Sequence, residues 1–551
     1  MRYGVFRDME SRCIGGASGC PFFFRIPVRL NFLVAWALGS LLCAWTAYAI
    51  APHEVAVLIN KNDASSLEVA NHFVHDRQIP PQNVVTLALP NDRDIVTITP
   101  GEFEEWIWKP AVKQLEGRGV QGHILAWVYS SGFPTTISTN PEMSICGLTF
   151  VRNQLPDPGT IDGGLRSPLF AGPIHREGDK KSSQSFDRFA VELDEGAMPL
   201  PSMMLGYTWA RGNSTAVVVD VIKRGVRSDF TRPKGNVYFY FRDDIRFEAR
   251  LWQMLEVRNE LLNMGVITKV ANNLPDRATD RIFGLMTGTQ YLEMGNVSNI
   301  LPGAYCDHLT SFAARYQTHL QMKTSAWFDA GATLSSGTVT EPYATWMKFP
   351  HARFYVHYAN GCSAIESLYQ SVLAPTQLLL LGEPLARPYG WPFKLQAVVD
   401  GRTIRASAEG IPTGTRLIYT LLVNGRIRKN FAVNPEFKLD DDWLEPGWNE
   451  VRVVGVTDGA VGHVEQAIIG LHNGDVKVAI NPGERVSVHV VEGDVPEKVR
   501  LVKNEESFIT VKGEAEVSFS LEADLVGRGP SVLYAEALVD DKWVRSKPLV
   551  R

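Results

Sequence analysis

The segment from Pro302 to Ser311 concentrates more reactive side chains than any other part of this sequence. It reads PGAYCDHLTS and holds a thiol, a carboxylate, an imidazole and two hydroxyls. Cys306 becomes a nucleophile when a nearby base or cation lowers its pKa, and His308 is such a base. Residues two apart on a strand share a face, so we expect Cys306 and His308 to point together and Asp307 to point away. Two interpretations stay open: a catalytic group of Cys306, His308 and Asp307, or a buried thiol followed by two helix-capping residues.

A second segment, SSGTVTEPY over residues 335–343, follows an apolar run and is rich in hydroxyl groups. Such groups either bind a polar substrate or satisfy the amides of a loop. Glu341 precedes a proline, which favours an extended backbone and an outward-facing acid. The candidate substrate-binding residues are Ser311, Ser335, Ser336, Thr338, Glu341 and Tyr343.

Motifs for metals and nucleotides are missing. The residues His351, His357 and Cys362 are too loosely spaced for a zinc site, and neither HExxH nor CxxC occurs. The loop after the first apolar strand, residues 60–66, contains no glycine-rich phosphate motif. We therefore predict no metal and no cofactor.

Alternating apolar runs and amphipathic stretches must position these residues. Residues 55–59, 84–89 and 124–129 are typical of buried strands, and helical patterns lie between them. This order predicts right-handed crossovers and a three-layer αβα domain with a mainly parallel sheet, over residues 50–392. Residues 135–235 lack the pattern, and we interpret them as a less regular insertion or lid.

The character of the chain changes after a proline-rich connector at residues 387–392. Alternating strands follow, punctuated by the hairpin dipeptides Asn424-Gly425 and Asp458-Gly459. We expect two small all-β, immunoglobulin-like sandwiches, at 393–472 and 473–551. Neither contains a cluster of titratable groups, so they are spacers or binding surfaces.

Residues 31–51 carry no charge and follow Arg25 and Arg29. Ala47-Tyr48-Ala49 has the small-x-small pattern that a signal peptidase needs, which predicts a signal peptide over residues 1–49. An uncleaved membrane anchor is the alternative, since about 20 apolar residues also span a bilayer. Either way, we expect the rest of the chain outside the cytoplasm: periplasmic, secreted or at the cell surface. Membrane contact is expected only through this segment, and only if it is not cleaved.

Three stretches carry a resemblance to a known group of proteins: LPGAYCDHLTSF (301–312), GATLSSGTVTEPY (331–343) and QLLLLGEPLARP (377–388). They resemble an uncharacterised family of exported bacterial proteins and, more distantly, the gingipain-like and caspase-like cysteine peptidases. The resemblance implies a caspase-like or Rossmann-like α/β domain with an immunoglobulin-like module behind it, and a nucleophile near Cys306. The base of those peptidases is a His-Gly pair at the end of the preceding strand, whereas this chain reads LMTGT over 285–289.

The length and net charge of the chain limit the classes of function that it can have. The 551 residues suggest three or four domains, and a net charge of −5 with no basic patch argues against a nucleic-acid partner. We expect an exported, non-catalytic or degenerate peptidase-like binding or scaffold protein with a polypeptide or cell-surface partner. The alternative is a hydrolase that uses Cys306 with His308, or a hydroxyl of Ser311 or Ser336 with Glu341.

Overall fold

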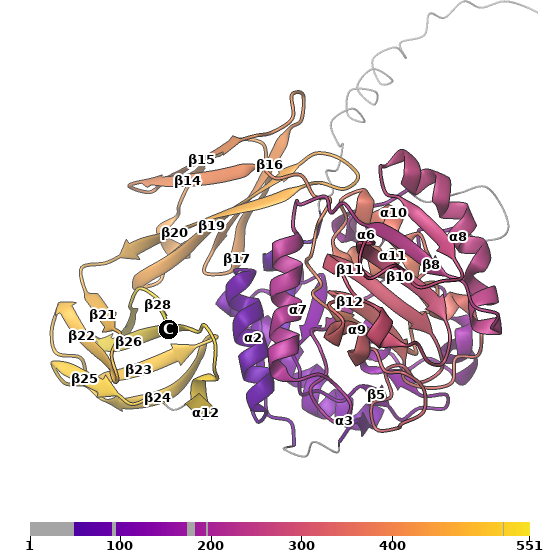
Figure 1. Ribbon diagram of the computed structural model, residues 1–551. Coiled ribbons are helices and arrows are strands. Elements are labelled where there is room, and N and C mark those ends of the chain that lie inside the picture. Colours follow the sequence, from indigo (N-terminus) through magenta and orange to yellow (C-terminus); the bar gives the residue numbers. More distant parts are fainter. Residues whose placement is uncertain (1–48, 91–94, 174–181, 194–196, 522) are drawn as a thin grey trace, which may run out of the picture. The chain divides into compact units, whose positions relative to one another are not determined.

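The computed structural model describes residues 49–90, 95–173, 182–193, 197–521 and 523–551. The expected leader therefore lies outside the described residues, except for Ala49. Up to residue 392 the chain is a mixed α/β region, and from residue 393 it forms mainly antiparallel strands (Figure 1). Within the described ranges, no helix combines the length and the apolar composition that a membrane crossing requires.

A ten-stranded sheet forms the centre of the α/β region, in the order β2-β1-β4-β7-β13-β12-β11-β10-β8-β9. Neighbouring strands run parallel, except for the antiparallel pair of β12 and β13. The strands are β1 (Val55–Asn60), β2 (Val84–Leu87), β4 (Ala126–Tyr129), β7 (Ser202–Met204), β8 (Asn236–Tyr240), β9 (Thr268–Ala271), β10 (Ile282–Gly288), β11 (Ile300–Leu309), β12 (Leu334–Thr338) and β13 (Leu378–Gly382).

Both faces of this sheet carry a hydrophobic core, because successive strand side chains point to opposite faces. In β1, Val55, Val57 and Ile59 enter one core, and Ala56 and Leu58 enter another. The first core includes side chains from the helices α2 (Ala64–Asp76), α6 (Phe186–Glu192), α7 (Thr215–Ser228), α8 (Ile245–Asn263), α10 (Phe354–Ala359) and α11 (Ala364–Ser371). Cores on the other face include side chains from α3 (Pro100–Phe103), α4 (Lys109–Gly117), α5 (Ile145–Phe150) and α9 (Ser325–Asp329).

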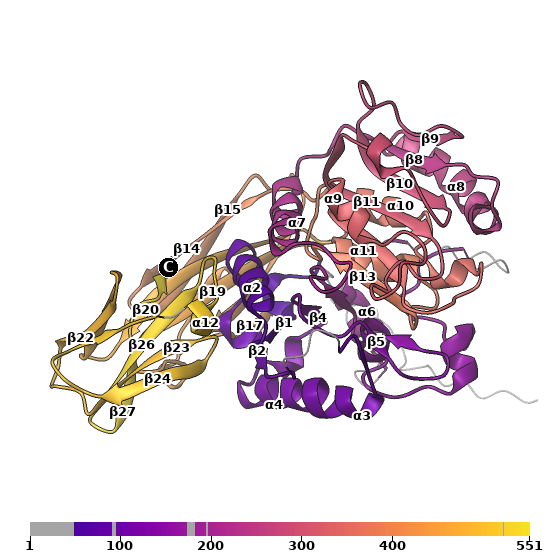
Figure 2. The same cartoon turned by 60° about the horizontal axis from the view of Figure 1, so that its bottom comes forward.

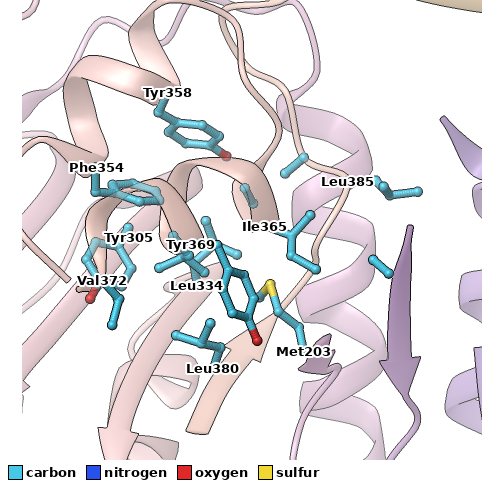
Figure 3. Packing of buried hydrophobic residues seen from close by; sticks show 14 of the residues in the cluster. Met203, Tyr305, Leu334, Phe354, Tyr358, Ile365, Tyr369, Val372, Leu380 and Leu385 are labelled. Carbon is cyan, nitrogen blue, oxygen red and sulfur yellow. The ribbon is translucent and has the colours of Figure 1, made fainter. Parts of the chain in front are cut away.

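Aromatic side chains fill the first core between the sheet and the helices α10 and α11. Figure 3 shows Tyr305 and Leu380 of the sheet beside Phe354, Tyr358 and Tyr369 of these helices. The rings of Tyr305 and Phe354 have their centroids 4.5 Å apart. Tyr305 thus packs β11 against these helices.

The interpretation of residues 135–235 as an insertion needs correction. This stretch contributes β7 to the middle of the main sheet, and α7 contacts both α2 and β11. It also holds β5 (Thr136–Ile137) and β6 (Met143–Ser144), which form a small sheet with β3 (Thr97–Ile98). With only three residues, SMM, β7 is too short for periodicity to reveal it.

From residue 393 the chain consists almost entirely of strands (Figure 2). These strands fall into two groups, each with its own hydrophobic core. Each group has a three-stranded sheet of its own, β14-β15-β18 or β21-β22-β25. The other strands belong to one nine-stranded sheet that runs through both groups, which the parallel pair of β19 and β27 joins. The first group is β14 (Lys394–Asp400), β15 (Thr403–Glu409), β16 (Leu417–Val423), β17 (Arg426–Ala432), β18 (Glu436–Lys438), β19 (Gly447–Thr457) and β20 (Val464–Asn473). The second is β21 (Lys477–Asn481), β22 (Val486–Glu492), β23 (Lys498–Lys503), β24 (Glu506–Lys512), β25 (Glu516–Phe519), β26 (Val532–Val539), β27 (Lys542–Arg545) and β28 (Leu549–Val550), with the short helix α12 (Ala523–Val526).

Candidate functional site

Cys306, Asp307 and His308 all lie inside β11, with β10 as one parallel neighbour and β12 as the other. The strand continues to Leu309, so Asp307 and His308 do not cap a helix. All three residues are fully buried. The catalytic candidates therefore occupy the interior of the sheet and not its edge.

The Cys306 thiol belongs to a small core that also contains Leu285, Trp327 and Ala332. Burial raises the pKa of this thiol far above its usual range. A protonated thiol in an apolar core is a poor nucleophile. The geometry thus offers no activated thiolate at Cys306.

Both ring nitrogens of His308 are occupied by structural partners. Trp327 Nε1 donates to His308 Nδ1 at 3.0 Å, so the ring proton lies on Nε2, which is 3.1 Å from the Met322 carbonyl oxygen. Burial lowers the pKa of His308 to about 4. The imidazole is therefore neutral, and neither nitrogen is available to remove a proton from Cys306.

Asp307 points to the opposite face of the sheet, where α8 supplies Arg250. The guanidinium nitrogens of Arg250 lie 3.1 and 3.0 Å from the two Asp307 oxygens, and the phenol of Tyr305 donates to Asp307 at 2.8 Å. Arg250 also donates to the carbonyl oxygens of Thr287 and Pro350. This fully buried ion pair joins β10, β11 and α8, and the three catalytic candidates are split between the two faces.

Most of the expected substrate-binding hydroxyls also serve the fold. Ser336 is 2.9 Å from the Tyr305 hydroxyl, and Thr338 donates to the carbonyl oxygens of Thr310 and Ser311. Ser335 is fully buried, and its hydroxyl has no hydrogen-bond partner. The side chains of Ser336 and Thr338 therefore link β12 to β11 and to the two residues that follow β11.

Glu341 and Tyr343 differ from the others because they lie in the exposed loop after β12. The Tyr343 side chain is 66% exposed, and its backbone N–H donates to Glu341 Oε1 at 2.8 Å. Tyr343 has a φ of 58°, a left-handed conformation that bulky residues rarely adopt. Of the site residues expected from the sequence, only these two lie at the exposed surface.

Two further exposed side chains, which the sequence reasoning missed, lie in the loops after β10 and β11. Tyr291 and Leu320 are each 59% exposed. Their loops are joined, because the Gln321 N–H donates to the Tyr291 hydroxyl at 2.9 Å and the Met322 N–H donates to the Gln290 carbonyl. The only sequence signal was a large apolar residue inside a polar loop.

We call Tyr291, Leu320, Glu341 and Tyr343 the rim. Since β10, β11 and β12 are adjacent and parallel, the loops that follow them lie at the same edge of the sheet.

Lys323 lies in the loop after β11, and its ammonium group donates to the carbonyl oxygens of Phe312 and Leu320. Burial, with the nearby charges of Arg211 and Arg315, lowers the pKa of Lys323 to about 8.

The sequence Gly382-Glu383-Pro384, which begins at the last residue of β13, also has a structural role. Glu383 is fully buried and pairs with Arg77, whose Nε lies 3.0 Å from Glu383 Oε1. Arg77 also forms an ion pair with Asp229.

Within the described residues, no group of three or more His, Cys, Asp and Glu side chains could hold a metal ion.

Comparison with known proteins identifies no family. No family model matches the chain, and no curated protein does either. Among solved structures, the fibronectin(III)-like modules of CbhA from Clostridium thermocellum are similar at 12% identity, over 29% of this chain and 91% of that one, with a TM-score of 0.11. A two-domain fibronectin type III segment of chicken tenascin is similar at 15% identity, over 29% and 95% of the two chains, with a TM-score of 0.13.

Proposed function

We propose that this protein is a non-catalytic, extracytoplasmic binding protein built on a cysteine-peptidase-like α/β frame, and that the rim binds an extended polypeptide. The frame would be of the gingipain or caspase type, and the two β modules would be immunoglobulin-like. The observation that carries the proposal is the exposure of Tyr291, Leu320 and Tyr343 on the loops of three adjacent parallel strands.

The position of the rim supports binding. Ligands of open α/β sheets bind beyond the carboxyl ends of the strands. Exposed tyrosines supply large contact areas at a low cost in conformational entropy and are enriched among the residues that dominate protein interfaces. Glu341 adds one acidic group beside Tyr343, which favours a basic or backbone N–H partner.

The environment of Cys306 supports the non-catalytic half of the proposal. A cysteine hydrolase needs an accessible thiolate with a base in reach. Cys306 is instead buried, and His308 has structural partners at both nitrogens. A hydrolase that uses Cys306 and His308 would need β11 to separate from the neighbouring strands and helices, so that substrate could reach them.

The test is binding of a fluorescently labelled library of unstructured peptides, measured by anisotropy. We expect Leu320→Ala and Tyr343→Ala each to weaken binding at least about tenfold, as truncation of a dominant interface side chain does. Val433→Ala and Val495→Ala are the matched controls, since these valines are exposed but lie in the β modules. Binding that the rim variants leave unchanged would rule out the rim.

The same labelled peptides also test whether the protein hydrolyses peptide bonds. We expect no cleavage by the wild-type protein and unchanged peptide binding by Cys306→Ala. Peptide turnover that Cys306→Ala abolishes, in a variant that still folds, would establish the hydrolase instead.

A further inference from the structure

The chain enters the described structure through a completely buried segment. Ala49, Ile50 and Ala51 are at most 2% exposed. The Ile50 N–H donates to Glu366 Oε1 at 3.0 Å, and the Ala51 N–H donates to Glu54 Oε2 at 2.8 Å. The backbone nitrogen of Ile50 is thus in direct contact with a buried carboxylate.

Glu366 holds this position as part of the N-terminal cap of α11. Its Oε2 accepts the N–H and the hydroxyl of Ser363 at 2.9 and 2.7 Å, and its Oε1 accepts the N–H groups of Ile50 and Phe186 at 3.0 Å. All four donors are neutral. Within the described part of the chain, no lysine or arginine forms an ion pair with Glu366.

A second acid lies near this carboxylate. Burial and the charge of Glu366 raise the pKa of Asp187 to about 6, and its Oδ2 has no hydrogen-bond partner. Burial likewise raises the pKa of Glu366 itself. An ionised carboxylate is costly to bury unless a cation is paired with it. A positive charge beside Glu366 would therefore stabilise its ionised form.

The sequence supplies a way to create that charge. The motif Ala47-Tyr48-Ala49 directs a signal peptidase to the bond between Ala49 and Ile50. The nitrogen of that same bond is the one that faces Glu366. A cut one residue earlier or later would put the new amino group on a different nitrogen.

We propose that the chain is cleaved between Ala49 and Ile50, and that the new α-ammonium of Ile50 forms a buried ion pair with Glu366. Hydrolysis consumes one water: its hydroxyl goes to the Ala49 carbonyl carbon, the C–N bond breaks, and the Ile50 nitrogen keeps the electron pair and becomes protonated. The ammonium takes over the contact that the amide N–H makes, and it neutralises the buried acid. Removal of the leader would thereby complete the fold.

The first test is the N-terminal sequence and intact mass of the protein isolated from cells that export it. We expect the mature chain to begin at Ile50. A mature chain that begins at any other residue, or that keeps residues 1–49, would overturn the proposal.

The second test separates the ion pair from the cleavage. Chains 50–551 and 47–551 are released from a removable N-terminal fusion and compared by thermal denaturation at pH 7. We expect the chain that begins at Ile50 to have the higher midpoint, by at least about 2 °C. This difference should vanish in Glu366→Gln and persist in Glu409→Gln, a control at an exposed acid of β15.

If Glu366→Gln fails to fold, acetylation of the Ile50 amino group gives the same information in the wild-type sequence. We expect the acetylated 50–551 chain to lose its advantage, because an amide carries no charge. Equal midpoints for the free-amine chain and the 47–551 chain, or an advantage that survives acetylation, would contradict the ion pair.

Discussion

Burial decides what the individual cysteines and histidines of this protein can do. Cys146, Cys306 and Cys362 are all buried and unpaired, and burial raises the pKa of each thiol, that of Cys146 to about 11. His308 lies on the same face of β11 as Cys306, as the two-residue strand period predicts, but its hydrogen bonds fix it to Trp327 and Met322. Proximity in sequence therefore brought these groups together without making them reactive.

At this scale we expect all three thiols to resist iodoacetamide in the folded protein from pH 5 to pH 9. Raised pKa values keep the thiols protonated, and burial excludes the reagent. Peptide mass spectrometry measures labelling at each site, and the urea-unfolded protein is the positive control. Fast labelling of Cys306 alone below pH 7 would contradict the buried site and favour cysteine catalysis.

At the scale of elements, close approach between strands decides where side chains are allowed. The antiparallel pair β12 and β13 sets Leu334 opposite Gly382, which has a φ of 116°. A Cβ atom at Gly382 would lie 2.1 Å from the Thr333 carbonyl oxygen. The glycine of the Gly-Glu-Pro sequence is thus required by the sheet and directs the chain to Glu383, the buried partner of Arg77.

We therefore expect Gly382→Ala to lower the free energy of unfolding by at least about 2 kcal/mol more than Gly265→Ala does. Gly265 is a matched control, because it also has a positive φ, of 78°, and its Cβ would meet nothing within 4 Å. Both variants place alanine at a positive φ, and only Gly382→Ala adds the clash with the Thr333 carbonyl oxygen. Urea unfolding measures both, and equal losses would show that β12 can move to accept the side chain.

At the scale of the whole molecule, the main hydrophobic cores are distinct, and a smaller cluster joins Ala51 of the α/β region to Leu422, Val454, Val456 and Val464 of the first β module. The α/β region has its cores on both faces of the large sheet, and each β module has one of its own. Leu421 belongs to the core of the first module and Leu501 to the core of the second, and both are fully buried. Side chains in different cores are expected to contribute independently to stability.

Leu501→Ala should accordingly destabilise the second module by about 2–5 kcal/mol, the usual cost of removing a buried leucine side chain. Hydrogen exchange resolved by peptide measures the effect, and we expect faster exchange over residues 477–550 with the α/β region unchanged. Leu525→Ala, at a leucine of the same module that is 48% exposed, is the control. Faster exchange throughout the chain would mean that the module and the α/β region unfold as one unit.

The sequence by itself determined what depends on local periodicity. Runs such as VAVLI over 55–59 have the composition of a buried strand, and hairpin dipeptides such as Asn424-Gly425 mark turns, so an α/β region followed by two β modules was predictable. The shared face of Cys306 and His308 follows from the same period.

Features that depend on contacts between residues distant in sequence could be determined only from the tertiary structure. The order of the sheet, the place of β7 within it and the pairing of Asp307 with Arg250, 57 residues away, arise from contacts that no local pattern encodes. Burial is a property of the packed chain, so it turned the expected catalytic residues into core residues. The rim emerged for the same reason, because loops far apart in sequence meet where parallel strands end side by side.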